Sequence, residues 1–132
     1  MNPADLLRPH DFLRIAYAAN IAILVPVCWA MFAGRGVRAV FQGAVAEEPG
    51  LRLLVGSLWA AILLASAAGL VWPRVFAPVL LIQIVYKSLW LALFALPALR
   101  NPAVPTPTGI TIIFALIVAI WPVLFWFGYL RA

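Results

Sequence analysis

The residue best placed to do chemistry in this sequence is Lys87, because it is the one charge within a long apolar stretch. It stands about midway between Arg74 and Arg100. At about 1.5 Å per helical residue it lies on the order of 15 to 20 Å from either end, too deep for easy snorkelling to the surface. A lysine at that depth costs roughly 2.5 kcal/mol or more unless it meets water or a partner. Lys87 is therefore a candidate for binding an ion, a lipid or a solute.

Polar and aromatic side chains accompany Lys87 on one face of its expected helix, where Gln83, Tyr86 and Trp90 share about 100° of arc with it. Earlier in the chain, Tyr17 and Asn20 offer a possible partner surface. The structural alternative is that Lys87 bonds to Asn20, Tyr17 or backbone carbonyls and only fixes helix register or a subunit contact. A misplaced end of the apolar span is a further alternative. The candidate intramembrane polar site consists of Lys87, Gln83, Tyr86, Asn20 and Tyr17.

Residue types that are missing from the apolar stretches exclude several classes of chemistry. The four acids, Asp5, Asp11, Glu47 and Glu48, lie outside them, so the usual carboxylate of a proton-coupled antiporter is absent. The single histidine, His10, excludes bis-histidine haem ligation within one chain and a His/Cys metal cluster. No phosphate-binding loop or nucleophile elbow occurs. We therefore expect no enzymatic activity, no catalytic residue, no cofactor and no metal.

The composition identifies the solvent of the elements that carry these residues. The sequence is 67% hydrophobic and only 10% charged, far from the balance of a soluble domain. Its apolar runs approach the roughly 20 residues that a helix needs to cross a bilayer, and lipid leaves backbone groups no other partner than the helix itself. We predict an all-α polytopic membrane protein, a single four-helix transmembrane domain over residues 1–132. The predicted spans are about 13–33, 52–72, 75–97 and 108–130.

Two connections between the spans carry structural predictions. The short sequence Trp72-Pro73-Arg74 predicts a tight hairpin that makes the second and third spans antiparallel neighbours. Between the first and second spans, apolar residues at helical spacing predict a short interfacial amphipathic helix over residues 36–46, with an irregular loop as the alternative. A stripe of small residues on the second span suits close helix packing, within the chain or against a partner chain. This stripe consists of Ser57, Ala61, Ala65 and Gly69.

These features suggest three possible functions. We favour a non-catalytic accessory or structural subunit that packs against a larger membrane complex, because little of the chain lies outside the spans. The alternative is an oligomeric transporter or channel for an anionic or amphipathic solute, lined by Lys87. A lipid-modifying enzyme is the weakest, since Lys87 would be its only acid or base within the spans. The span layout resembles that of small four-helix membrane proteins grouped with the DoxX type, a resemblance that rests on no motif and implies no activity.

Charge and location complete the expectations. Lys and Arg number nine against four Asp and Glu, but they are scattered near the ends of the spans, so we expect no binding of nucleic acid. The expected partners are membrane lipids and other membrane subunits, in a hetero- or homo-oligomer. We expect the protein to be located in the bacterial inner (cytoplasmic) membrane. Cytoplasmic termini are a base-rate expectation, because the arginines divide equally between the two sides.

Overall fold

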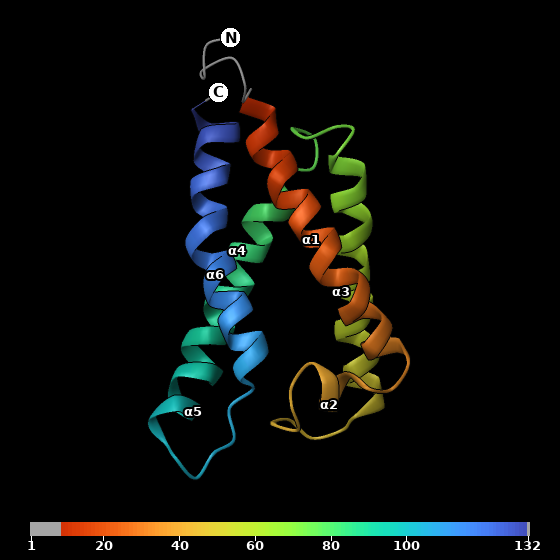
Figure 1. The fold of residues 1–132 in the computed structure, drawn as a ribbon, viewed down its shortest axis with the longest axis vertical. Coiled ribbons are helices and arrows are strands. Elements are labelled where there is room, and N and C mark those ends of the chain that lie inside the picture. The colour runs from red at the N-terminus through yellow and green to blue at the C-terminus, as the bar shows by residue number, and fades with distance from the viewer. Residues whose placement is uncertain (1–8, 132) are drawn as a thin grey trace.

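The computed structural model describes residues 9–131, which form a bundle of long helices (Figure 1). Within these residues, four stretches are long and apolar enough to cross a membrane: His10–Phe32, Pro49–Gly69, Pro78–Arg100 and Thr108–Leu130. This confirms the predicted all-helical architecture with four apolar helices; the ends differ by up to three residues, as at Pro49, predicted at residue 52. The elements are α1 (Pro9–Phe32), α2 (Gly36–Ala39), α3 (Pro49–Gly69), α4 (Pro78–Trp90), η2 (Leu91–Ala95), α5 (Leu96–Arg100), α6 (Thr108–Phe125) and η3 (Trp126–Leu130).

The third apolar stretch changes its helical pitch before it ends. The π-helical segment η2 separates α4 from α5. Pro97, within α5, has no N–H to donate to the carbonyl four residues earlier, and its ring crowds the preceding turn. The wider π turn lies where this proline disturbs the α-helical pattern.

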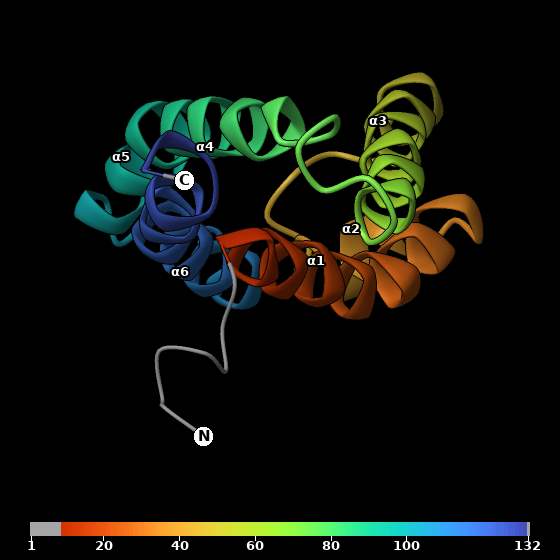
Figure 2. The same ribbon diagram turned by 90° about the horizontal axis from the view of Figure 1, so that it is seen from above.

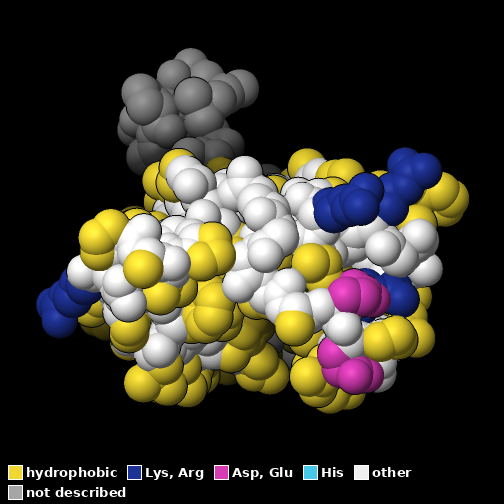
Figure 3. Space-filling view, turned by 90° about the horizontal axis from the view of Figure 1, so that it is seen from below, with side chains coloured by type: hydrophobic (Ala, Val, Ile, Leu, Met, Phe, Trp, Pro, Cys, Tyr) yellow, Lys and Arg dark blue, Asp and Glu magenta, His cyan; other side chains and the backbone are white. Residues whose placement is uncertain are grey.

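The exterior of the bundle is apolar along its length. Trp29, Leu64 and Leu93 are each more than two thirds exposed, at 74%, 71% and 75%. Figure 3 shows that charged side chains at the α2 end of the molecule lie toward the edge of a face made mostly of hydrophobic and uncharged groups. Such a surface favours hydrocarbon over water as its solvent, so the fold supports an integral membrane protein.

The long helices pair as two hairpins. α1 packs chiefly on α3, and α4 packs chiefly on α6, while α1 also contacts α6 and η3. Seen from above, the helices follow the order α3, α1, α6, α4 around the bundle, and α3 and α4 stand apart at its open side (Figure 2). The start of α1 and the end of η3 lie at the same end of the bundle (Figure 1).

The connection between α3 and α4 is longer than the sequence predicted. α3 ends at Gly69 and α4 begins only at Pro78, so residues 70–77 form a series of turns instead of a three-residue link. A connection of this length lets the two helices separate. They touch only slightly, and each packs on another helix instead.

The connection between α1 and α3 contains much less helix than predicted. Within residues 36–46, only Gly36–Ala39 are α-helical. The chain then turns through Gln42 and Gly43, both at positive φ (53° and 76°), which ends the helix. Phe41 stacks on Trp59 of α3 with ring centroids 6.1 Å apart, so this segment folds inward beneath the bundle instead of lying flat along a surface.

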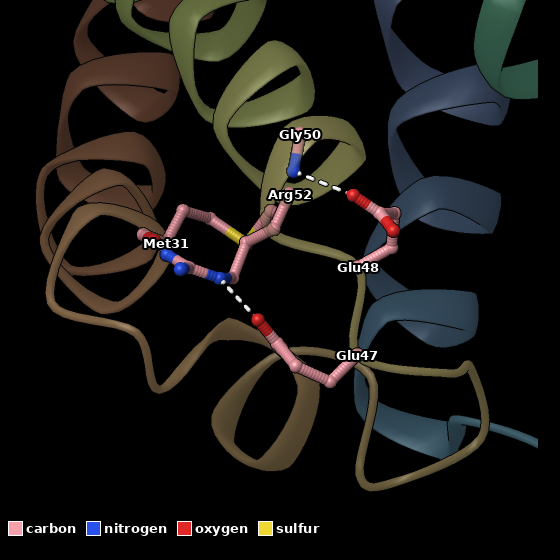
Figure 4. A network of polar contacts seen from close by, with 5 residues as sticks. All are labelled: Met31, Glu47, Glu48, Gly50 and Arg52. Atoms are coloured by element: carbon pink, nitrogen blue, oxygen red, sulfur yellow. Dashed lines mark hydrogen bonds and ion pairs between the residues drawn. The ribbon is translucent and has the colours of Figure 1, made fainter.

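Polar contacts hold the start of α3 in place (Figure 4). The Glu48 side chain caps the helix by accepting a hydrogen bond from Gly50 N at 2.9 Å. Arg52 Nε pairs with Glu47 Oε1 at 2.8 Å, and Arg52 also donates to the backbone carbonyl of Met31 on α1. The beginning of α3 is thereby joined to the end of α1.

Candidate functional site

Hydrogen-bonding side chains from all four long helices meet inside the bundle. Asn20 Nδ2 of α1 donates to Gln83 Oε1 of α4 at 3.0 Å and to Ser66 Oγ of α3 at 3.1 Å. Gln83 Nε2 donates in return to Asn20 Oδ1 at 3.3 Å, and Trp121 Nε1 of α6 donates to Gln83 Oε1 at 3.1 Å. None of the four residues is more than 5% exposed. We call Asn20, Ser66, Gln83 and Trp121 the amide cluster.

The amide cluster provides hydrogen bonds to polar groups that lipid cannot hydrogen-bond. Each donor or acceptor left without a partner in hydrocarbon costs several kcal/mol, so reciprocal bonds between two amides are a compact solution. The predicted members Asn20 and Gln83 are brought together here. The cluster therefore fixes the relative positions of α1 and α4, which are neither consecutive in the chain nor partners in one hairpin.

Lys87 lies one turn beyond Gln83 on α4 and is 2% exposed. Its Nζ donates to Tyr86 Oη at 2.5 Å and lies 4.4 Å from the centroid of the Tyr86 ring and 4.8 Å from that of Phe114. Trp59 Nε1 of α3 donates to the same Tyr86 Oη at 3.1 Å. Lys87 is thus held by aromatic faces and one phenol, without a bond to Asn20 or to a backbone carbonyl among the described residues.

No ion pair of the described residues includes Lys87. The ion pairs in this part of the chain join Arg14 to Asp11 and Arg52 to Glu47, both at ends of the long helices. Contact with an aromatic face is worth on the order of 2 kcal/mol to a desolvated cation, but it leaves the charge uncompensated. A cationic Lys87 would therefore gain from an anionic partner.

Tyr17 lies apart from Lys87, contrary to its inclusion in the candidate polar site. Its Oη donates to the backbone carbonyl of Pro73 at 2.7 Å, in the connection between α3 and α4. Its ring lies against Gly69, where an added Cβ would come within 2.7 Å of the ring. Tyr17 thus anchors the connection to α1, and the alternative in which it bonds to Lys87 is not found.

The small-residue stripe faces the interior of the chain only at one end. Ser57 and Ala61 are exposed and Ala65 is half-buried, while Gly69 is buried against α1. Steps of four residues advance about 40° around a helix of 3.6 residues per turn. The stripe therefore rotates by about 120° between Ser57 and Gly69, too far to remain on one contact face.

A cavity of about 160 Å³ adjoins the amide cluster and Lys87, between α1, α4 and α6. We call it the central cavity. Asn20, Gln83 and Lys87 contribute polar groups to its lining, and Gln42 does so toward the α2 end. There Gln42 Oε1 accepts a hydrogen bond from Gly109 N at 3.1 Å, which ties the loop to the start of α6. A cavity of about 150 Å³ is large enough for a benzene-sized molecule.

The lining of the central cavity favours an anion over a cation. It combines the Lys87 amine with the side-chain amides of Asn20, Gln83 and Gln42 and contains no Asp or Glu. In the described part of the chain, no group of three His, Cys, Asp or Glu is placed to hold a metal ion. What the arrangement can do chemically is bind a small negatively charged or amphipathic molecule between the helices.

Four residues at the site were not predicted from the sequence: Ser66, Trp121, Trp59 and Phe114. A usable signal existed for the two tryptophans, since a buried indole N–H needs an acceptor and the spans contain few. Ser66 is likewise one of the few hydroxyls within an apolar run. Phe114 carries no such signal, because an aromatic residue in an apolar helix is ordinary.

No family model matches the sequence, and comparison with curated proteins and with solved structures gives no match either.

Proposed function

We propose that this membrane protein binds an anionic or amphipathic solute at Lys87 in the central cavity, as a carrier or channel subunit. The observation that carries the proposal is a buried lysine beside a cavity whose lining has no carboxylate. A charge in this position costs free energy unless it is compensated, and a bound anion compensates it. Binding of the anion and stabilisation of Lys87 are then the same event.

Charge at the α2 end supports access from that side. Arg35 and Arg38 are exposed at α2, and neither belongs to an ion pair of the described residues. The segment that follows them lines the cavity through Ala39, Val40 and Gln42. Positive charge near an opening raises the local concentration of anions and their rate of entry.

The test compares an anion with a neutral molecule of the same shape. Benzoate and benzamide are titrated into the protein in lipid nanodiscs, and binding is followed by tryptophan fluorescence, because Trp59 lines the cavity. We expect the wild type to prefer benzoate, and Lys87→Met to lose that preference, which Lys87→Arg retains at least in part. Equal affinity of the wild type for both probes would overturn the proposal.

A second candidate function is the accessory subunit of a larger membrane complex. It is favoured by α3, where only 17% of the most apolar window is buried, compared with 39% in α1. Leu54 and Leu64 on this helix are 55% and 71% exposed. Mild extraction followed by mass spectrometry tests it: a partner that co-purifies with the wild type should be lost when Leu54 and Leu64 are both replaced by Trp. A bacterial cytoplasmic membrane, cytoplasmic termini and the lack of enzymatic activity stay predictions.

A further inference from the structure

A groove of about 670 Å³ runs between α3 and α4 at the open side of the bundle. We call it the lateral groove. Leu58, Ala61 and Ala65 line it from α3, and Val79 and Ile82 line it from α4. It faces the region that hydrocarbon occupies if the four helices span a bilayer. An apolar groove in that position is filled by an apolar group.

The size of the lateral groove favours a flexible chain over a helix. A helix with its side chains is about 10 to 12 Å wide and rises 5.4 Å per turn, so one turn fills roughly 400 to 600 Å³. A helix of the about 20 residues needed to span the membrane could therefore lie only partly within the groove, along its open side. An acyl chain is narrower and has no backbone polar groups that need partners.

The polar end of the lateral groove leads to Lys87. Trp59 and Tyr86 both line the groove, and Trp59 Nε1 donates to Tyr86 Oη at 3.1 Å. Behind them, Lys87 Nζ lies 2.5 Å from the same Tyr86 Oη and lines the central cavity. Trp59 and Phe114 line both spaces. The hydrogen bond between Trp59 and Tyr86, and the rings of these two residues, thus separate the apolar groove from the buried Lys87 amine.

We propose that the lateral groove binds the acyl chain of a fatty acid, whose carboxylate passes between Trp59 and Tyr86 and pairs with Lys87. This inference rests on the proposed function, because it takes Lys87 as the anion site. The carboxylate replaces the bond between Trp59 and Tyr86 with bonds of both groups to itself. Charge complementarity supports the assignment, since a carboxylate and a lysine that are both buried stabilise each other only as a pair.

Depth within the membrane favours a single-chain amphiphile over a phospholipid. Lys87 is nine residues from Pro78 and 13 from Arg100, about 14 and 20 Å along the helix. A phospholipid headgroup stays near the membrane surface and does not reach that depth. A fatty acid carries its charge on a small group that the protein can enclose.

The experiment measures binding of tritiated palmitate and of benzoate to the full-length protein in nanodiscs. Ala61→Phe and Ala65→Phe fill the lateral groove, and Ala67→Phe, on an exposed position of α3 outside the groove lining, is the matched control. We expect the groove variants to bind palmitate at least about tenfold more weakly and to bind benzoate like the wild type, and the control to change neither. Retained benzoate binding also verifies that the variants are folded.

The outcomes separate this inference from the proposed function. If Lys87→Met weakens both probes and the groove variants weaken palmitate alone, the fatty-acid site is supported. If the groove variants bind palmitate like the wild type while benzoate still requires Lys87, the groove assignment is overturned and the proposed function stands. If neither probe depends on Lys87, both fall. If the groove variants lose a membrane protein that co-purifies with the wild type but still bind palmitate like the wild type, the groove is assigned to a protein partner. That result would also overturn the inference.

Discussion

Replacing Gln83 by methionine removes the centre of the amide cluster while nearly preserving side-chain volume. The substitution deletes three hydrogen bonds, two with Asn20 and one with Trp121. Hydrogen bonds between membrane helices average about 0.6 kcal/mol and reach about 1.7, so three give a loss of about 2 to 5 kcal/mol in the free energy of unfolding. The upper part of this range is expected, because Trp121 Nε1 and Asn20 Oδ1 are left buried without partners.

The matched control is Ser66→Ala, which removes one bond and leaves the amide pair intact. Its expected cost is about 0.6 kcal/mol, roughly a third of the smallest loss expected for Gln83→Met. Both variants are unfolded at equilibrium in mixed micelles by raising the mole fraction of sodium dodecyl sulfate, and helix content is followed by circular dichroism. A double-mutant cycle with Asn20→Leu should give a coupling energy of about 1 kcal/mol between residues 20 and 83.

Two results would refute this reasoning. If Gln83→Met costs no more than Ser66→Ala, the three bonds do not stabilise the bundle. If the effects of Asn20→Leu and Gln83→Met simply add, the two amides do not act as a pair.

Three further substitutions test separate features of the fold by the same unfolding assay. Gly69→Ala should cost about 1 to 3 kcal/mol, because its Cβ would lie 2.7 Å from the Tyr17 ring, while Gly109→Ala, with nothing within 4 Å, should cost little; equal effects would contradict the close approach of α3 to α1. Gly43→Ala should cost about 1 to 2 kcal/mol because its φ is +76°, and it should speed proteolysis of the loop after α2; unchanged cleavage would contradict the turn. Arg52→Gln should cost less than about 1 kcal/mol, and the cost should shrink with added salt because Glu47 is 45% exposed; a salt-independent loss would show that its pairing with Glu47 is not the stabilising contact.

The number and nature of the spans follow from the sequence because hydrocarbon leaves few choices. A run of apolar residues long enough to cross the thickness of a bilayer becomes a helix. Pro49, Pro78 and Pro97 only adjust the ends or the pitch of these helices. The same reasoning identified four residues that meet in the interior or beside it, Asn20, Gln83, Tyr86 and Lys87. A polar side chain in an apolar helix finds no hydrogen-bonding partner in hydrocarbon, so it faces the interior of the bundle.

Which helices pair could not be predicted by the same means. The three residues Trp72-Pro73-Arg74 suggested the whole connection, because residues 70–71 and 75–77 on either side of them are apolar like the spans although they are not helical. Helix pairing depends on shape, such as the fit of Tyr17 over Gly69, which no pattern of hydrophobicity records. Of the small-residue stripe only Gly69 is buried within the chain, and contact of the rest with a partner chain stays a prediction.

The pairing of α1 with α3 and of α4 with α6 has a consequence for how the chain enters the membrane. Each pair consists of consecutive spans, so the first can insert and close before the ribosome has delivered the second. Each also contains a polar bond of its own, Asn20 to Ser66 in the first and Gln83 to Trp121 in the second. Each half therefore has some of its polar groups hydrogen-bonded in the lipid before the other half is present. The reciprocal amide bonds between Asn20 and Gln83 form when the two halves associate.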